Sequence, residues 1–144
     1  MKIIKVALGN NTEAFIENSF TDGVNIIFSD DNNKGKTIVI QSILYTLGNK
    51  PIFPSSFDYK QYYYYLEFES NEKKYAVIRR GDAYIVSSSD GLRLFEDYSE
   101  FKRFWNAEIF SLPKIKFKGH KKIVDMELFS QMFFIGQDLS LIHI

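Results

Sequence analysis

The sequence contains no cysteine and only two histidines, His120 and His143. The absence of cysteine excludes disulfide bonds, thiolate zinc sites and cysteine nucleophiles. Two histidines make a histidine-rich metal centre or a histidine-based catalytic triad improbable. No run approaches the roughly 18 apolar residues of a transmembrane helix, and residues 1–5 alternate charged and apolar side chains, unlike a signal peptide. We therefore expect a cytoplasmic protein.

An excess of charge of either sign is also missing. Eighteen basic and eighteen acidic residues give a formal net charge of zero, so the overall charge does not indicate a nucleic-acid or membrane partner. Proline and glycine are few, at three and eight, whereas fourteen Phe, nine Tyr and one Trp are present. This composition favours an ordered, strand-rich protein. The length of 144 residues predicts a single domain, residues 1–144, with a sizeable core.

Apolar periodicity predicts the order of the elements. Alternating or continuous apolar patterns predict strands at residues 2–8, 14–20, 24–28, 62–70, 74–80 and 83–88. The helical spacing of Ile40, Ile43, Leu44 and Leu47 predicts a helix over residues 37–47, ended by Gly48-Asn49. Two more helices are expected, at residues 98–109 with Asp97 as N-cap, and at residues 126–135 with Leu128, Phe129, Met132 and Phe133 buried. The predicted fold is α/β with α+β character: a mixed sheet around the first helix, plus an antiparallel β-meander.

The segment before the first helix carries the most informative motif. Residues 26–37 read I-I-F-S-D-D-N-N-K-G-K-T and place Gly35-Lys36-Thr37 between an apolar strand and a helix, as a phosphate-binding loop requires. The lysine of such a loop reaches the terminal phosphates, and the hydroxyl binds Mg²⁺. Asp30 replaces the first glycine of the pattern G-x-x-x-x-G-K-[ST]. The alternative is a polar turn that binds nothing.

This loop and the helix I-V-I-Q-S-I-L-Y-T-L-G after it resemble the N-terminal lobe of SMC-like and RecN/RecF-like ATPases, which are ABC-type ATP-binding heads. Asn32 matches the loop asparagine of that family, and Gly35, Lys36 and Thr37 match its glycine, lysine and hydroxyl. The resemblance implies a P-loop half-domain that binds ATP and Mg²⁺. Asn33, Lys34 and Gly35 would supply backbone amides, Lys36 would hold the β- and γ-phosphates, and Thr37 would hold the Mg²⁺.

Gln137 is the second correspondence to the family. It falls where the resemblance places the Q-loop glutamine, which contacts the Mg²⁺ and the attacking water, so it is a candidate catalytic residue and metal ligand. The alternative is a surface glutamine that follows a helix.

The motifs that the family supplies from its second lobe are not found in the sequence. No signature motif or Walker B strand is present, so we expect ATP binding with little hydrolysis by this chain alone. The implied partners are the C-terminal lobe of the same ATPase, a second head in a dimer, and DNA through a parent protein that acts in repair, chromosome maintenance or defence. Strands from the missing lobe are expected to complete the sheet.

Two basic patterns have competing interpretations. Arg79 and Arg80 either approach the nucleotide, as in the resembled family, or form a solvated hairpin end. Five lysines between residues 114 and 122 form either a nucleic-acid-facing strand or a charged edge that discourages aggregation. The runner-up for the whole chain is a nucleotide-independent, aromatic-rich interaction module with a vestigial loop, and Asp30 keeps that alternative open. The absence of an N-K-x-D motif disfavours a small kinase or GTPase.

Overall fold

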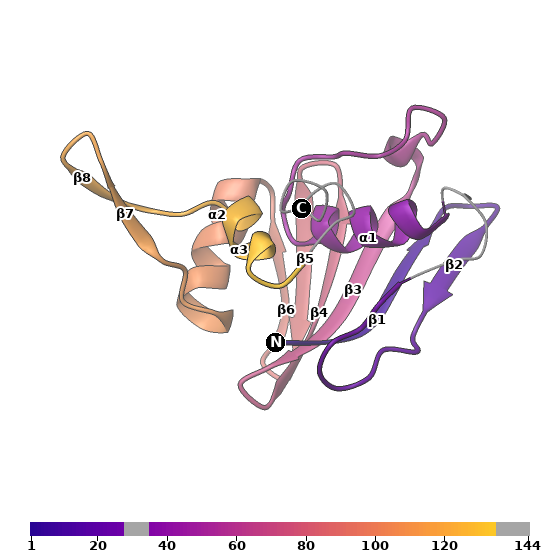
Figure 1. The fold of residues 1–144 in the computed structure, drawn as a ribbon, viewed down its shortest axis with the longest axis horizontal. Coiled ribbons are helices and arrows are strands. Elements are labelled where there is room, and N and C mark those ends of the chain that lie inside the picture. Colours follow the sequence, from indigo (N-terminus) through magenta and orange to yellow (C-terminus); the bar gives the residue numbers. More distant parts are fainter. Residues whose placement is uncertain (28–34, 135–144) are drawn as a thin grey trace, which may run out of the picture.

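The computed structural model describes residues 1–27 and 35–134, which form a six-stranded antiparallel sheet with helices on one face (Figure 1). The strand order is β2-β1-β3-β4-β5-β6. The strand bounds are β1 (Lys2–Gly9), β2 (Ala14–Glu17), β3 (Tyr63–Ser70), β4 (Lys73–Arg80), β5 (Ala83–Ser88) and β6 (Gly91–Phe95).

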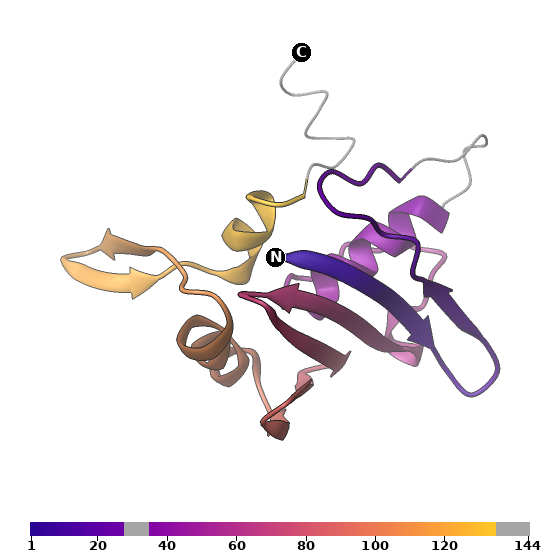
Figure 2. The same cartoon turned by 90° about the horizontal axis from the view of Figure 1, so that it is seen from below.

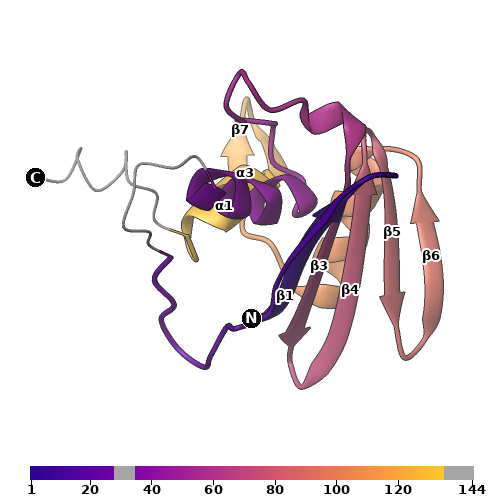
Figure 3. The same ribbon diagram turned by 90° about the vertical axis from the view of Figure 1, so that its right-hand side faces the viewer.

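The helices cover the inner face of this sheet (Figures 2 and 3). Helix α1 packs across β1, β3 and β4, and α2 packs against β5 and β6. A separate two-stranded ribbon, β7–β8, projects from the far side of α2 (Figure 1). The bounds are α1 (Gly35–Thr46), the short 3-10 helix η1 (Tyr59–Gln61), α2 (Tyr98–Phe104), the π-helix η2 (Trp105–Ile109), β7 (Lys114–Phe117), β8 (His120–Ile123) and α3 (Met126–Gln131).

Strict alternation along the central strands separates a buried inner face from an outer face. On β3, Tyr64, Leu66 and Phe68 are at most 1% exposed, whereas Tyr63 is 51% exposed. Because paired residues of neighbouring strands share a face, the inward residues of the sheet form one continuous layer. This layer meets aromatic side chains of the helices, and the largest fully buried members are Tyr64, Phe68, Tyr84, Phe101, Trp105 and Phe129.

The β-meander of the sequence analysis is confirmed, with turns at Asn71-Glu72 and at Gly81. Strand β6 was missed, since its two leucines are exposed and a glycine begins it. The expectation of a mixed sheet is wrong for the described residues, where every strand pairing is antiparallel.

The strand predicted at residues 24–28 is not formed over its described part, residues 24–27. Val24 is 90% exposed and Ile26 is 79% exposed. A strand requires a neighbour to accept its backbone hydrogen bonds, and none of the described strands pairs with this segment. The apolar pattern alone was therefore not sufficient to form a strand.

The helix predictions hold in position and differ in detail. Asp97 caps α2 by accepting a hydrogen bond from the Glu100 backbone N at 2.9 Å, as predicted. The helix predicted at residues 98–109 changes to π geometry at Trp105. In α1 the buried stripe includes Ser42 and Thr46, whose hydroxyls donate back to the carbonyls of Ile38 and Ser42, both at 2.6 Å. These internal bonds satisfy the two hydroxyls in the core.

The buried face predicted for the last helix is mostly wrong. Phe129 is fully buried as expected, but Leu128, Met132 and Phe133 are 46%, 58% and 40% exposed. Helix α3 instead buries Met126 and Ser130 beside Phe129. The buried side of α3 includes the polar Ser130, whereas the apolar Leu128 is exposed, so the apolar pattern did not show which side meets the core.

No helix in the described part of the chain is long and apolar enough to cross a membrane.

Candidate functional site

The first turn of α1 presents Gly35, Lys36 and Thr37 at the surface. Gly35 and Thr37 are exposed and Lys36 is half-buried. A Cβ built on Gly35 would meet no atom within 4 Å, so the backbone at the helix start is open. The first turn contains no acidic residue, and the positive end of the helix dipole therefore lacks an acidic partner of its own there. This geometry suits an anionic ligand.

A cavity of about 240 Å³ lies beside this helix start. It is smaller than the roughly 300–1,000 Å³ of pockets that hold a whole drug-sized ligand, so its size suits a flat ring better than an entire nucleotide. Its wall is mainly apolar and comes from β1–β2, α1 and the segment before β3. The lining residues are Leu8, Glu13, Ala14, Phe15, Gly35, Ile38, Val39, Phe57 and Tyr62.

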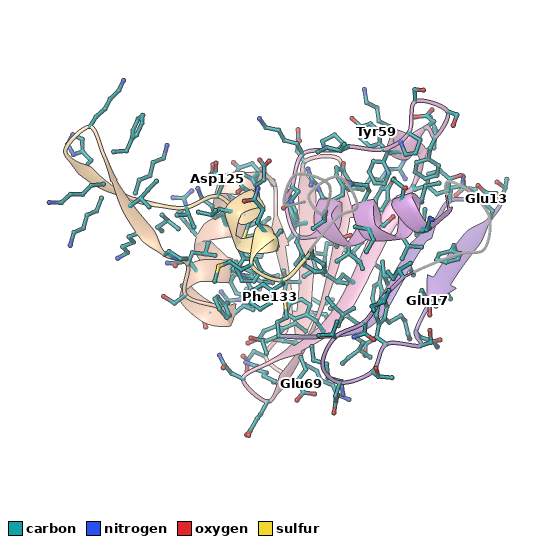
Figure 4. All side chains as sticks on the ribbon, in the orientation of Figure 1. Glu13, Glu17, Tyr59, Glu69, Asp125 and Phe133 are labelled. Carbon is teal, nitrogen blue, oxygen red and sulfur yellow. The ribbon has the colours of Figure 1, made fainter. Side chains whose placement is uncertain are left out.

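One wall of this cavity is a pair of stacked rings. Phe57 and Tyr62 lie with centroids 4.9 Å apart and planes inclined by 21°. The Tyr62 hydroxyl donates to the Glu13 carboxylate, and this hydrogen bond raises the pKa of Tyr62 above its ordinary value. Glu13 lies on the same side of the molecule as the start of α1 (Figure 4). The bond therefore ties the turn between β1 and β2 to the aromatic wall.

The Asn10 side chain fixes the same turn from within. Its Oδ1 atom accepts hydrogen bonds from the backbone N of Thr12 and of Glu13, both at 3.0 Å. The backbone N of Asn10 donates to the Glu13 carbonyl at 2.9 Å. In an Asx turn of this kind, a side-chain oxygen accepts hydrogen bonds from backbone N–H groups. Thr12 and Glu13 lie between β1 and β2, where no pairing among the described strands supplies these acceptors. The cavity wall is thus built by local bonds that are independent of any ligand.

The other end of α1 is held by Arg79 of β4. The Arg79 Nη1 atom donates to the carbonyls of Tyr45 at 2.5 Å and Asn49 at 2.9 Å, and Nε donates to the Gly81 carbonyl at 2.9 Å. Its guanidinium lies 3.7 Å from the Tyr45 ring centroid and 4.9 Å from that of Tyr84. The cation therefore satisfies carbonyls at the negative end of the helix dipole.

The backbone completes this C-terminal cap. The Gly48 N donates to the Tyr45 carbonyl at 3.0 Å, and the Asn49 N donates to the Leu44 carbonyl at 3.1 Å. Gly48 has φ of 103°. This pairing is a Schellman motif, which confirms the predicted stop at Gly48-Asn49. A side chain at Gly48 would also come within 2.9 Å of Tyr98.

The structure describes only part of the site predicted from the sequence. It brings Gly35, Lys36 and Thr37 together at the start of α1, next to the cavity. The remaining residues of the prediction lie outside the described residues: Asp30, Asn32, Asn33, Lys34 and Gln137. Arg79 is buried and binds the opposite end of α1, so it is not the solvated hairpin end that was the alternative and it does not lie at the predicted phosphate site, whereas Arg80 is exposed. The twelve residues of α1 span about 18 Å between these ends.

Sequence reasoning missed the cavity and its aromatic wall. Its residues come from four separate segments, so no local motif connects them. A weak signal existed in the dense aromatic residues before β3, namely Phe53, Phe57, Tyr59 and Tyr62. All four of these rings, however, also pack against the buried cluster of Leu8, Tyr45 and Tyr64, and the sequence could not separate the two roles.

Comparison with curated proteins finds two relatives of part of this chain. This chain is 37% identical over 81 residues to the Lamassu protein LmuB of Bacillus cereus (strain VD014). The matched region covers 56% of this chain and 14% of that protein. The chain is 34% identical over 83 residues to the Lamassu protein LmuB of Bacillus sp. (strain NCIM 5461 / CCTCC AB 2011126 / NIO-1130), covering 57% and 15%. The match therefore spans about a seventh of each relative. No family model matches the chain.

Proposed function

We propose that this chain binds Mg·ATP at the start of α1 and forms the N-terminal lobe of a two-lobe, SMC-like ATPase head. The observation that carries the proposal is the junction of Gly35-Lys36-Thr37 with the adjoining cavity. The motif supplies the chemistry for phosphates, and the cavity supplies an apolar space with stacked rings for a base.

Each residue has a defined role in this proposal. The Lys36 ammonium neutralises the β- and γ-phosphates, and the Thr37 hydroxyl faces the Mg²⁺. Backbone amides of Asn33, Lys34 and Gly35 surround the phosphates, with Asn32 in the same loop. Gln137 orients the Mg²⁺ and the attacking water. These last roles rest on the sequence motif and on the family resemblance.

Turnover by this chain alone is expected to be slow. Phosphoryl transfer to water depends on positioned phosphates, Mg²⁺ and an oriented water. The groups proposed here position the phosphates, and the C-terminal lobe of the head would supply the rest. A dimer of heads and a DNA substrate belong to the proposed parent protein. Among repair, chromosome maintenance and defence, the similarity to Lamassu proteins is compatible with defence.

The competing interaction module loses one of its supports. Its argument was the aromatic content, and the largest aromatic side chains lie in the core, where Tyr64, Tyr84, Phe68 and Trp105 are at most 1% exposed. Packing of the sheet against the helices accounts for these residues. Their number therefore gives no separate indication of a protein-binding surface.

The test is calorimetric titration of the full chain with Mg·ATP. We expect Lys36→Ala to abolish measurable binding, because the charge that meets the phosphates is removed. The matched control is Lys50→Ala, an exposed lysine just beyond the other end of α1, which should leave the Kd unchanged. Unchanged affinity in Lys36→Ala would sink the proposal. A clear preference for GTP over ATP would favour the small GTPase class instead.

A further inference from the structure

The β7–β8 ribbon presents a concentrated positive charge away from the body of the protein. Residues 114–122 contain five lysines and one histidine and no acidic residue. All residues of the ribbon are exposed except Ile123, which is half-buried. The ribbon projects on the side opposite Glu13 and the candidate nucleotide site (Figure 4). It is therefore a second surface, separate from the candidate nucleotide site, and its binding can be tested without reference to ATP.

The ribbon is anchored at its base. Leu112 and Val124, which flank the two strands, are each only 3% exposed and belong to the core cluster. The Val124 N donates to the Pro113 carbonyl at 3.0 Å, and the Leu112 N donates to the Asn106 Oδ1 atom at 2.8 Å. These contacts fix the direction in which the ribbon leaves the protein.

The tip of the ribbon is a tight turn. Lys118 has φ of 49° and Gly119 has φ of 80°. Two successive residues with positive φ are typical of the two-residue turns that match the twist of paired strands. The ribbon is thus an ordered projection with a defined register.

The register gathers three lysines on one face. Lys116 is paired directly with Lys121, and Lys114 lies two residues before Lys116 on the same strand. Because side chains of a strand alternate and paired residues share a face, these three residues form the lysine face. Among residues 1–27 and 35–134, no ion pair involves any of them. The acid after β8, Asp125, pairs with Lys102 of α2 at 3.1 Å instead.

The paired lysines lower the stability of the ribbon when no partner is bound. Like charges placed directly opposite each other destabilise a strand pair, and a two-stranded hairpin is marginally stable even without repulsion. Lysines on an edge strand are sufficient to prevent aggregation. That role does not require two lysines to face each other across the strands with no carboxylate nearby. A polyanionic partner would remove the repulsion that the fold leaves in place.

We propose that the lysine face binds the phosphate backbone of duplex DNA. A duplex carries one phosphate for about every 1.7 Å of its axis, so several phosphates lie along the length of a face that presents three lysines. A two-stranded ribbon fits the DNA major groove, which is about 12 Å wide, whereas the major groove of duplex RNA is too narrow for it. The opposite face carries Ile115 and Phe117, at 50% and 55% exposed, together with their pair partners Lys122 and His120.

The test measures binding of the full chain to a fluorescent 30-base-pair DNA duplex by anisotropy at several salt concentrations. The variant combines Lys114→Gln, Lys116→Gln and Lys121→Gln. The control combines Lys50→Gln, Lys60→Gln and Lys74→Gln, three exposed lysines outside the ribbon, and has the same net charge. Thermal unfolding of both triple variants checks that each is folded.

We expect the ribbon variant to bind at least tenfold more weakly than the control. The slope of log Kobs against log salt should fall by about 2 to 3, since each lost phosphate contact removes about 0.9. Equal losses in the two triple variants would overturn the proposal, as would undetectable binding of the unmodified chain at 50 mM salt. Equal affinity for an RNA duplex would overturn the groove assignment. Binding to anionic lipid vesicles without binding to DNA would assign the lysine face to a membrane surface instead.

Discussion

The two ends of α1 are held in different ways. At the C-terminal end, Arg79, the Schellman motif and a cluster of rings around Tyr45 satisfy the last carbonyls and bury the last turn. At the N-terminal end, Gly35 and Thr37 are exposed beside a cavity, and the first turn contains no acidic residue. One end of the helix is stabilised by the protein, and the other is left accessible.

This difference suits the ligand site that we propose at the start of α1. A ligand site is most effective when its groups are held in place before the ligand arrives. The anchored end fixes the axis of α1 against β3 and β4, so the open end does not need its own packing to stay in position. Under the proposed function, ligand binding and stability depend on separate residues of the same helix, and substitutions should separate the two effects.

The largest expected effect is the loss of the Tyr45 ring. Tyr45 is 4% exposed and lies 4.9 Å from the Tyr64 ring and 5.7 Å from those of Phe53 and Tyr59. We expect Tyr45→Ala to lower the free energy of unfolding by about 3–5 kcal/mol, as for other large buried rings. Urea unfolding measures this change. Thr37→Ala at the open end serves as the control and should change stability by at most about 0.5 kcal/mol. Similar losses in the two variants would contradict the contrast between the ends.

Arg79→Met should have the second largest effect. The substitution keeps an apolar stem but leaves the carbonyls of Tyr45 and Asn49 without their Arg79 donor, at a cost of about 1–3 kcal/mol. The neighbouring Arg80, which is exposed and stacks on Tyr63 at 4.3 Å, provides the matched variant Arg80→Met, expected to change stability by less than about 0.5 kcal/mol. Urea unfolding of both variants tests the assignment. A larger loss in Arg80→Met would show that the cap is misassigned.

The smallest effect concerns alkaline pH. Burial raises the pKa of Tyr45, Tyr64 and Tyr84 above their ordinary value of 10. A raised pKa favours the protonated folded state, so this contribution is fully present below pH 10 and is lost as the pH rises above it. Above pH 10, and below the raised pKa, one such tyrosine lowers the free energy of unfolding by about 1.4 kcal/mol per pH unit.

The variant Tyr84→Phe isolates one of these groups. Among the described residues, the Tyr84 hydroxyl has no hydrogen-bond partner, so its removal should not destabilise the protein at pH 8. Between pH 8 and pH 11 the variant should lose about 1 kcal/mol less stability than the unmodified protein. Urea midpoints at the two pH values provide the measurement, and identical losses would contradict the assignment.

Local patterns predicted much of the fold. Alternation identified β1 and the three strands of the meander, and helical spacing with Gly48-Asn49 identified α1 and its end. Asp97 was recognised as the cap of α2. These features depend on residues near one another in the sequence, which is why a pattern of a few residues was sufficient. The motif at Gly35-Lys36-Thr37 is likewise a contiguous segment, and its assignment as a phosphate-binding loop stays a prediction.

Other features required the tertiary structure. The apolar segment at residues 24–27 has the composition of a strand, yet no strand in the described part of the chain pairs with it. Arg79 could not be assigned from its position at a strand end, because its partners lie 30 and 34 residues away. The cavity likewise combines four distant segments.

The sequence by itself determined where most of the strands and helices lie, where α1 ends and how α2 is capped, since capping and periodicity act over a few residues. Only the tertiary structure decided what each face meets. It placed a cation from β4 at one end of α1 and an aromatic cavity at the other, and it aligned Lys116 with Lys121 across the β7–β8 ribbon. Those outcomes depend on the packing and register of segments that are distant in the sequence, and a local residue pattern does not specify such contacts.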